Sequence, residues 1–225
     1  MSVQVSAAQV KSLRDRTGAG INDCRQALIE AGGDEEKAIE IIRKKGLAKA
    51  AKKAGAIATE GRIVSYVHPN YRIGVLVEVN CQTDFTARSE EFASLCEEIA
   101  MHIAAANPLY LRREEVPESE RQKQLEIFRG QIEEEEKATG KRKPEAAIAK
   151  ILEGKMEKWY SEVCLEEQEL VSRERKSVGA FVAELSGKVG EKIAIRRFVR
   201  YELGEGIETQ KRDFAAEVAA QLHGG

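Results

Sequence analysis

Apolar residues recur at helical spacing in the first part of the chain and fall into three short segments separated by glycines. The first segment begins at Ser6, where Gln9 three residues later completes a capping box. Asn22 and Asp34 stand at the starts of the second and third segments, and we expect each to cap its helix. The pattern predicts a three-helix bundle, followed by a helical, solvated linker in the Ala- and Lys-rich residues 47–56.

A two-residue alternation typical of β-strands begins after Thr59. It covers RIVSYV and RIGVLVEVN, with HPN between them, and therefore predicts a hairpin. After Thr83 the spacing becomes helical, and this helix is predicted to end at Asn107. The apolar residues that share its buried face are Phe85, Phe92, Leu95, Cys96, Ile99 and Ile103. A strand pair followed by a packed helix is an α+β unit.

The second half of the chain repeats the order of helix and strand. The predicted elements are a solvated helix over residues 113–142 with a break at Gly140, helices over 144–163 and 175–187, a strand over 193–203, and an amphipathic helix over 213–222. The strand alternation slips at Arg196 and Arg197, which predicts a β-bulge. Because strand and helix occur together twice, the pattern indicates two related halves.

The composition of the chain argues against a nucleic-acid-binding protein and against a membrane or secreted protein. The 225 residues are 42% hydrophobic and 33% charged, with a formal net charge of -2. A dedicated nucleic-acid binder usually has a clear basic excess, so we do not expect direct nucleic-acid binding. The chain shows neither an apolar run long enough to span a bilayer nor a secretory signal pattern at its start. We expect a cytoplasmic protein, although a mature organellar protein would have the same pattern.

Patterns typical of catalytic or metal sites are missing from the sequence. The four cysteines, Cys24, Cys81, Cys96 and Cys164, are widely scattered, and no phosphate-binding loop or HExxH motif occurs. His102 lies beside the apolar face of a predicted helix, and we interpret it as structural rather than as a general base. We therefore expect neither an enzyme nor a cofactor or metal.

A basic tract spans the end of the third predicted helix and the linker, and it has two interpretations. Its members are Arg43, Lys44, Lys45, Lys49, Lys52 and Lys53. They could contact phosphates of RNA or the ribosome. Alternatively, they form an ordinary polar face near a helix C-terminus, where cations are favoured. We prefer the second interpretation.

Two loops also allow a local and a functional interpretation. TGAG at residues 17–20 is explained by a tight interhelical turn, but loop tips are also common contact sites. In NCQTDF, Thr83 or Asp84 could cap a helix whose core face Phe85 begins. Alternatively, a carboxylate beside an aromatic ring on a strand-to-helix corner would suit a pocket of another protein.

Four stretches resemble the bacterial-type translation elongation factor Ts family: VKSLRDRTGAGINDCRQAL, GDEEKAIEIIRKKGLAKAAKKA, VLVEVNCQTDFTAR and RRFVRYELGEGIE. The resemblance implies an α+β fold that begins with a three-helix domain like the ubiquitin-associated (UBA) domain, with its linker, at residues 1–55. Residues 57–205 would form the dimerisation-type core, made of two related α+β subdomains. Residues 206–225 would form a short C-terminal helical module. Compared with the family, we expect the chain to lack the long coiled-coil insertion that some members carry.

The partner implied by the resemblance is elongation factor Tu, and the implied activity is exchange of its bound guanine nucleotide. Asp84 and Phe85 would enter the GTPase domain near its Mg²⁺ site, with Thr83 beside them. The family resemblance also places Thr17, Gly18, Ile21 and Asn22 near the GTPase domain. Either a homodimer or a one-to-one complex would fit, and the rival functions are an RNA-associated adaptor and an unrecognised enzyme.

Overall fold

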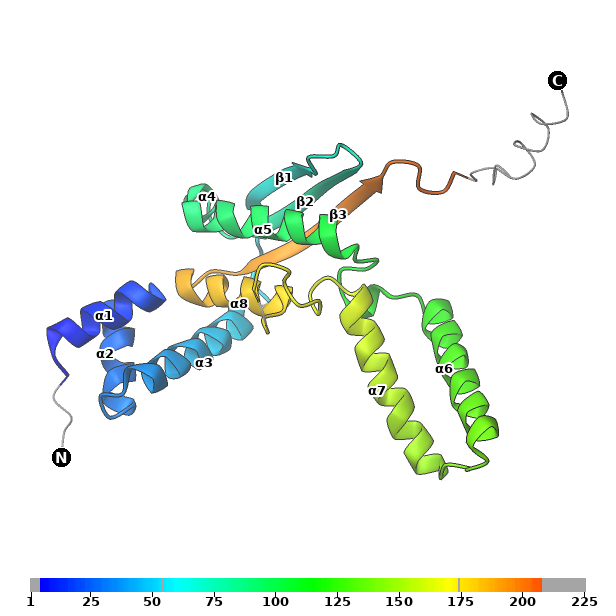
Figure 1. The fold of residues 1–225 in the computed structure, drawn as a ribbon. Coiled ribbons are helices and arrows are strands. Elements are labelled where there is room, and N and C mark those ends of the chain that lie inside the picture. The colour runs from blue at the N-terminus through cyan, green and yellow to red at the C-terminus, as the bar shows by residue number, and fades with distance from the viewer. Residues whose placement is uncertain (1–4, 54, 174, 208–225) are drawn as a thin grey trace, which may run out of the picture.

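The structure, a computed structural model, describes residues 5–53, 55–173 and 175–207, and Figure 1 shows its elements. The helices are α1 (Ala7–Thr17), α2 (Ile21–Glu30), α3 (Glu35–Lys53), α4 (Asp84–Arg88), α5 (Glu90–Ala106), the 3₁₀ turn η1 (Arg113–Glu115), α6 (Glu118–Thr139), α7 (Glu145–Val163) and α8 (Val178–Val189). The strands are β1 (Glu60–Val67), β2 (Ile73–Cys81) and β3 (Ile193–Glu202). The α+β class is thus confirmed.

The three N-terminal helices pack around a small core of their own, formed by Leu13, Ala19, Cys24, Ala27, Leu28 and Ala38. The predicted capping box is present, because the Ser6 hydroxyl accepts a hydrogen bond from the Gln9 amide at 3.2 Å. The Asp34 carboxylate likewise accepts from the Lys37 amide at 3.1 Å. The cap predicted at Asn22 is wrong. Helix α2 already begins at Ile21, and Gly20 occupies the cap position without a side-chain bond.

Helix α3 continues without a break to Lys53, which corrects the prediction of a separate linker over residues 47–56. Alanine and lysine have high helix propensity, so the segment after Gly46 extends the helix that precedes it. Gly46 remains inside the helix and packs against Gly187 of α8. The predicted domain limits at residues 55 and 205, and the likeness to a UBA domain, stay predictions.

The strands form one antiparallel sheet in the order β1-β2-β3. The hairpin predicted between the first two strands is confirmed. A bulge also lies where the alternation slips, since Glu78 pairs with Arg197 and Val79 pairs with Ile195. Because β3 pairs with β2, the later strand joins the sheet begun by the first two. The interpretation as two related halves stays a prediction.

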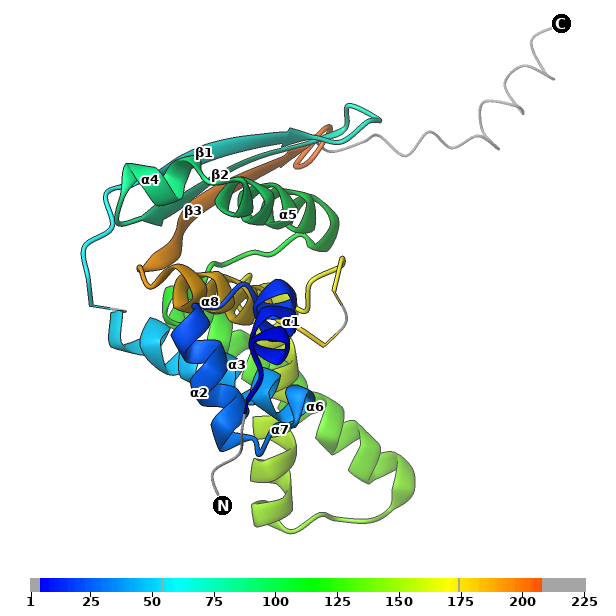
Figure 2. The ribbon, with the colours of Figure 1, turned by 90° about the vertical axis from the view of Figure 1, so that its left-hand side faces the viewer.

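The main core lies between one face of this sheet and helices α5 and α8. Figure 2 shows the layers, with the sheet uppermost, α5 beneath it and α8 below. The sheet contributes Val75, Val77, Val79, Cys81, Ile193 and Ile195, and the helices contribute Phe92, Leu95, Cys96, Ile99, Ile103, Val178, Val182 and Leu185. The opposite face of the sheet carries the exposed side chains of Ile63, Leu76, Val199 and Tyr201.

The helix predicted after Thr83 is two helices rather than one. Helix α4 ends at Arg88, and Ser89, whose backbone is extended, caps α5 through a bond from the Phe92 amide at 3.2 Å. The change of direction removes Phe85 from the face that carries Phe92. Phe85 is 84% exposed, so the expectation that it begins the core face is wrong. The predicted end at Asn107 is confirmed by its left-handed backbone.

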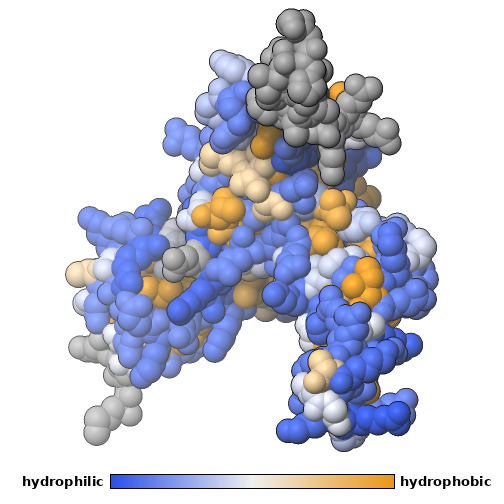
Figure 3. Space-filling model, turned by 45° about the vertical axis from the view of Figure 1, so that its right-hand side comes forward, coloured by the Kyte–Doolittle hydropathy of each residue, from blue (hydrophilic) through white to orange (hydrophobic). Residues whose placement is uncertain are grey.

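Helices α6 and α7 pair as an antiparallel hairpin that projects from the body (Figure 1). Its surface is mostly hydrophilic, with scattered apolar residues (Figure 3). Ile132 and Leu152 are buried, whereas Ala147, Ile148 and Ile151 of α7 are half-buried. The sequence predicted both helices but not their pairing. The expectation that the long coiled-coil insertion of some family members is missing stays a prediction.

Two expectations lie largely or wholly outside the described residues. The amphipathic helix predicted at residues 213–222 falls there, as does nearly all of the C-terminal module predicted at 206–225. Among the helices that the structure describes, none has the length and apolar character needed to cross a membrane.

Candidate functional site

The strand-to-helix corner at the end of β2 presents Asp84 and Phe85 to solvent. Thr83 is the N-cap of α4, and its hydroxyl accepts from the Thr86 amide at 3.3 Å. Asp84 forms an ion pair with Arg88 one helical turn later, at 2.9 Å. The Phe85 ring packs into no part of the described core and is 84% exposed. The corner therefore offers an aromatic ring beside a carboxylate.

Buried residues and hydrogen bonds fix the backbone of this corner. Thr86 and Ala87 are buried, and the Ala87 carbonyl accepts from Arg62 Nε at 2.5 Å. The Cys81 thiol donates to the Thr83 carbonyl at 3.2 Å. Burial raises the pKa of Cys81, which keeps the sulfur protonated and able to donate. Because this backbone is already constrained, it loses little further conformational freedom when a partner buries the ring.

A second exposed group lies at the turn between α1 and α2. Gly18 ends α1 with a φ of 64°, a left-handed conformation that favours glycine. The Thr17 hydroxyl donates to the Leu13 carbonyl at 2.7 Å and accepts from the Ala19 amide at 3.3 Å. Ile21 is 58% exposed at the first position of α2. Asn22 is exposed beside it.

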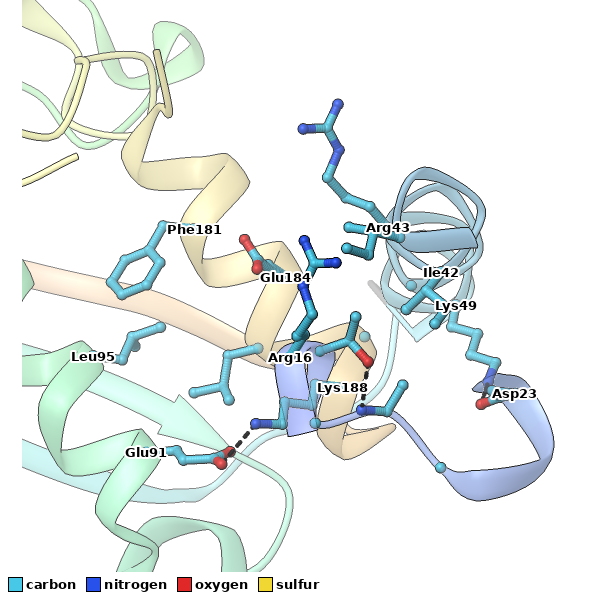
Figure 4. Close-up of a pocket in the computed structure, with 18 of the residues that line it drawn as sticks. Arg16, Asp23, Ile42, Arg43, Lys49, Glu91, Leu95, Phe181, Glu184 and Lys188 are labelled. Atoms are coloured by element: carbon cyan, nitrogen blue, oxygen red, sulfur yellow. Dashed lines mark hydrogen bonds and ion pairs between the residues drawn. The ribbon is translucent and has the colours of Figure 1, made fainter. Parts of the chain in front are cut away.

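The seven predicted site residues thus form two groups, Thr83–Phe85 and the four residues of the α1–α2 turn. Both groups lie on the side of the molecule that faces the viewer in Figure 2. A cleft of about 770 Å³ lies beside the turn, lined by residues of the bundle and of helices α5 and α8, which also contact one another at its edge (Figure 4). Its walls carry Arg16, Arg43 and Lys49 from the bundle, and Glu91, Glu184 and Lys188 from the core.

Two of the six cations in the basic tract are matched by carboxylates of the same bundle. Lys45 pairs with Glu30 at 2.7 Å, and Lys49 pairs with Asp23 at 2.8 Å. These pairs favour the interpretation of the tract as a polar helix face. The charge that would attract RNA phosphates is reduced accordingly.

His102 is buried between α5 and the loop that precedes α8. Its Nε2 lies 2.9 Å from the Gln168 carboxamide oxygen, and its Nδ1 accepts from the Val171 amide at 3.4 Å. With both nitrogens occupied, Nε2 carries the proton of a neutral ring. Burial lowers the pKa of His102, which further favours the neutral form and a structural role.

Across residues 5–53, 55–173 and 175–207, no group of three metal-ligating side chains is positioned to hold an ion. The model of the family described as Elongation factor TS matches residues 10–206 of this chain. That match covers most of the sequence. The chain belongs to the elongation factor Ts family.

Full-length relatives agree with this membership. The chain is 54% identical to the Elongation factor Ts of Desulforamulus reducens over 219 residues, which is 97% of this chain and 98% of that protein. It is also 54% identical to the Elongation factor Ts of Geobacter metallireducens over 218 residues, with the same coverage of both chains. The corresponding protein of Carboxydothermus hydrogenoformans is 53% identical over 218 residues. The resemblance read from the sequence is confirmed.

Two long-range contacts of this elongation factor Ts family member have no counterpart among the sequence predictions. Glu191 accepts from Thr83, and Lys188 lies against Gly18, across more than a hundred residues in each case. Sequence spacing carries no signal for such contacts. The pair between Asp84 and Arg88, by contrast, lies at the i,i+4 spacing of a helix and was predictable.

Proposed function

We propose that this chain is a guanine-nucleotide exchange factor that promotes release of GDP from elongation factor Tu during translation elongation in the cytoplasm. It performs no covalent chemistry of its own. Family membership supports the choice of partner. The observation that carries the mechanism is the exposed Phe85 ring beside Asp84 on a constrained corner.

In the proposed mechanism, Asp84 and Phe85 insert near the Mg²⁺ and phosphate site of the GTPase. A GTPase holds its nucleotide through phosphate-loop amides, a lysine and Mg²⁺. A nucleotide bound at nanomolar affinity is held by about 12 kcal/mol, so its spontaneous release is slow. Burying one Phe in the partner contributes roughly 1.5–3 kcal/mol, and each ~1.4 kcal/mol removed from nucleotide binding weakens it about tenfold.

Linkage makes this effect reciprocal. If the factor weakens nucleotide binding, the nucleotide must weaken binding of the factor by the same ratio. GTP entering the vacated site therefore expels the factor, and one molecule can act on many GTPases.

The α1–α2 turn supplies a second contact with the same GTPase in this proposal. Ile21 offers an apolar side chain, and Thr17, Gly18 and Asn22 shape the turn around it. Thr83 acts differently, because its hydroxyl caps α4 and orients the two residues that follow. The turn adds affinity, whereas the Asp84–Phe85 corner disturbs the nucleotide site.

We also propose that the chain forms a homodimer through the outer face of its sheet. Ile63 and Tyr201 are 68% and 70% exposed there, and Leu76 and Val199 lie between them on β2 and β3. An outer face with a group of exposed apolar side chains is typical of protein interfaces. Two copies packed face to face would remove it from water.

The test of exchange activity is release of fluorescent GDP from purified elongation factor Tu under excess unlabelled GDP. We expect the chain to accelerate release when it is present at far lower concentration than the GTPase. A folded chain that binds the GTPase without accelerating release would reject the exchange function and leave a docking protein.

A further inference from the structure

The C-terminal end of α8 and the loop after it, residues 187–191, touch both proposed contact groups. We call these residues the α8 terminus. Gly190 ends the helix with a φ of 74°, and its amide donates to the Ser186 carbonyl. The Ser186 hydroxyl donates to the Glu191 carbonyl at 2.5 Å. Hydrogen bonds within residues 186–191 therefore fix the conformation of the α8 terminus, independently of its contacts with the two groups.

Lys188 connects the α8 terminus to the α1–α2 turn. Its ammonium bonds to Glu91 of α5 at 2.7 Å. A methyl group placed on Gly18 would lie 2.2 Å from the end of the Lys188 side chain, so this side chain fills the space above the turn. Figure 4 shows Lys188 between the turn and Glu91. The bundle is thereby held against two helices of the core.

Gly187 brings the backbones of α8 and α3 together at the same place. A methyl group on Gly187 would lie 2.4 Å from the Gly46 carbonyl oxygen and 2.6 Å from its carbon. These are backbone atoms inside a helix, so they cannot move aside as the end of a side chain can. The two helices can approach this closely only because position 187 carries no side chain.

Glu191 connects the α8 terminus to the other contact group. Its two carboxylate oxygens accept from the Thr83 amide at 3.1 Å and from the Thr83 hydroxyl at 2.8 Å. The next residue continues the link, because the Lys192 amide donates to the Gln82 side chain at 2.8 Å. The corner that carries Asp84 and Phe85 is thus fixed to the segment that also fixes the α1–α2 turn.

We infer that the α8 terminus is a positioning element that sets the two contact groups at one fixed separation and orientation. Gly187 and Lys188 place the turn, and Glu191 places the corner. When both groups are rigidly connected, the second contact with a partner forms at a high effective concentration. The geometric part of this inference is independent of the partner, whereas its consequence for exchange rests on the proposed function.

The sharpest variant is Gly187→Ala, whose added methyl group must push α3 away from α8. The matched control is Gly154→Ala in α7, where a methyl group meets no atom within 4 Å. If Gly187→Ala does not fold, Lys188→Met removes the ion pair with Glu91 while keeping an apolar chain of similar length. Lys188 is partly exposed, so that substitution leaves both cores intact.

The first readout is the orientation of the bundle relative to the sheet in the free protein, from residual dipolar couplings of backbone amides. We expect one common alignment frame in the native chain and in Gly154→Ala. In Gly187→Ala the bundle and the sheet should show different frames, while each remains folded. A common, native frame in Gly187→Ala would overturn the inference.

The second readout is nucleotide exchange at increasing concentrations of the factor. Ile21→Ala should raise the half-maximal concentration of the native chain about fivefold, the usual scale for truncating an interface anchor. In the Gly187→Ala background the same change should have less than about a twofold effect, because the turn is already displaced. Phe85→Ala should lower the maximal rate in both backgrounds.

If Gly187→Ala only lowered stability, Ile21→Ala would raise the half-maximal concentration about fivefold in that background too, as it does in the native chain. That result would also overturn the inference. Failure of the proposed function looks different. In that case the native chain itself would not accelerate release, while the alignment measurement would still report how the α8 terminus places the bundle.

Discussion

At the scale of single residues, His102 shows how burial fixes a protonation state. The neutral ring donates to Gln168 and accepts from the Val171 amide, and burial keeps its pKa below the ordinary value of 6.5. The folded protein therefore binds this proton less readily than the unfolded chain does. At pH values between about 6.5 and the lower pKa of the folded state, His102 is protonated in the unfolded state but neutral in the folded state.

Stability should consequently fall as the pH drops from 7 toward 5, and His102 should account for part of that fall. We expect His102→Gln to reduce the slope of the free energy of unfolding against pH in this window. Urea denaturation at half-unit pH steps measures that slope. An unchanged slope in a folded variant would show that His102 does not titrate on unfolding.

Residue-level features were predictable where neighbours in sequence set them. The Ser6 capping box, the Asp34 cap and the bulge near Arg196 follow from local spacing and were predicted. The exposure of Phe85 does not follow from local spacing, because helical spacing places this residue on the face of Phe92 unless the helix breaks; it was implied only by the interpretation of Phe85 as a contact with another protein. The helix breaks at Ser89 because this residue caps α5. Tertiary packing decides whether the chain forms this cap or continues as one helix.

At the scale of elements, the α6–α7 hairpin is held together chiefly by its own helix pair. Ile132 of α6 is 2% exposed, and Leu152 and Met156 of α7 are also buried. A cation–π contact between Lys155 and the Phe128 ring, at 5.2 Å, adds a weaker link. Because the hairpin projects from the body, loss of its apolar contacts should loosen it without disturbing the sheet.

Ile132→Ala should therefore weaken the hairpin by about 2–4 kcal/mol, the usual range for truncating a buried isoleucine. Amide hydrogen exchange should become faster in α6 and α7 and remain native in β2 and α5. The matched control is Ile127→Ala, because Ile127 lies on the same helix and is 45% exposed. Faster exchange spread over the whole molecule would show that the hairpin and the body unfold together.

The sequence predicted the order of the longer helices and of the strands, but it did not predict α4 as a separate helix or the turn η1, and it predicted few of the contacts between elements. A glycine that interrupts a helical pattern, such as Gly46, resembles a helix end in sequence, but here it is a packing position of α3 against Gly187. The pairing of α6 with α7 was also missed. Periodicity indicates which face of an element is buried, but it does not indicate which element covers that face.

At the scale of the whole molecule, helix α5 covers the inner face of the sheet, and the outer face is exposed and carries both apolar and charged side chains. Its exposed residues Ile63, Leu76, Val199 and Tyr201 are the surface proposed to join two copies. Leu76→Lys should shift the chain toward monomer in sedimentation velocity, while Val171→Lys, at an exposed site away from the sheet, should not. A native chain that sediments as a monomer at high concentration would reject the homodimer.

The relation between the two contact groups could not be predicted at this scale. The α1–α2 turn and the Thr83–Phe85 corner were each identified through the family resemblance. Their connection through Lys188 and Glu191 joins residues more than a hundred positions apart. Such contacts depend on how bundle, helix and sheet pack together, which local sequence patterns do not encode.

The most direct test of the exchange mechanism compares Phe85→Ala with Tyr71→Ala in the release of fluorescent GDP from elongation factor Tu. Both aromatic rings are 84% exposed, so the two variants remove similar surface from different places. We expect both proteins to remain folded, Tyr71→Ala to accelerate release like the native chain, and Phe85→Ala to be slower by at least about tenfold, as loss of an anchor aromatic implies. Native exchange by folded Phe85→Ala would contradict the mechanism.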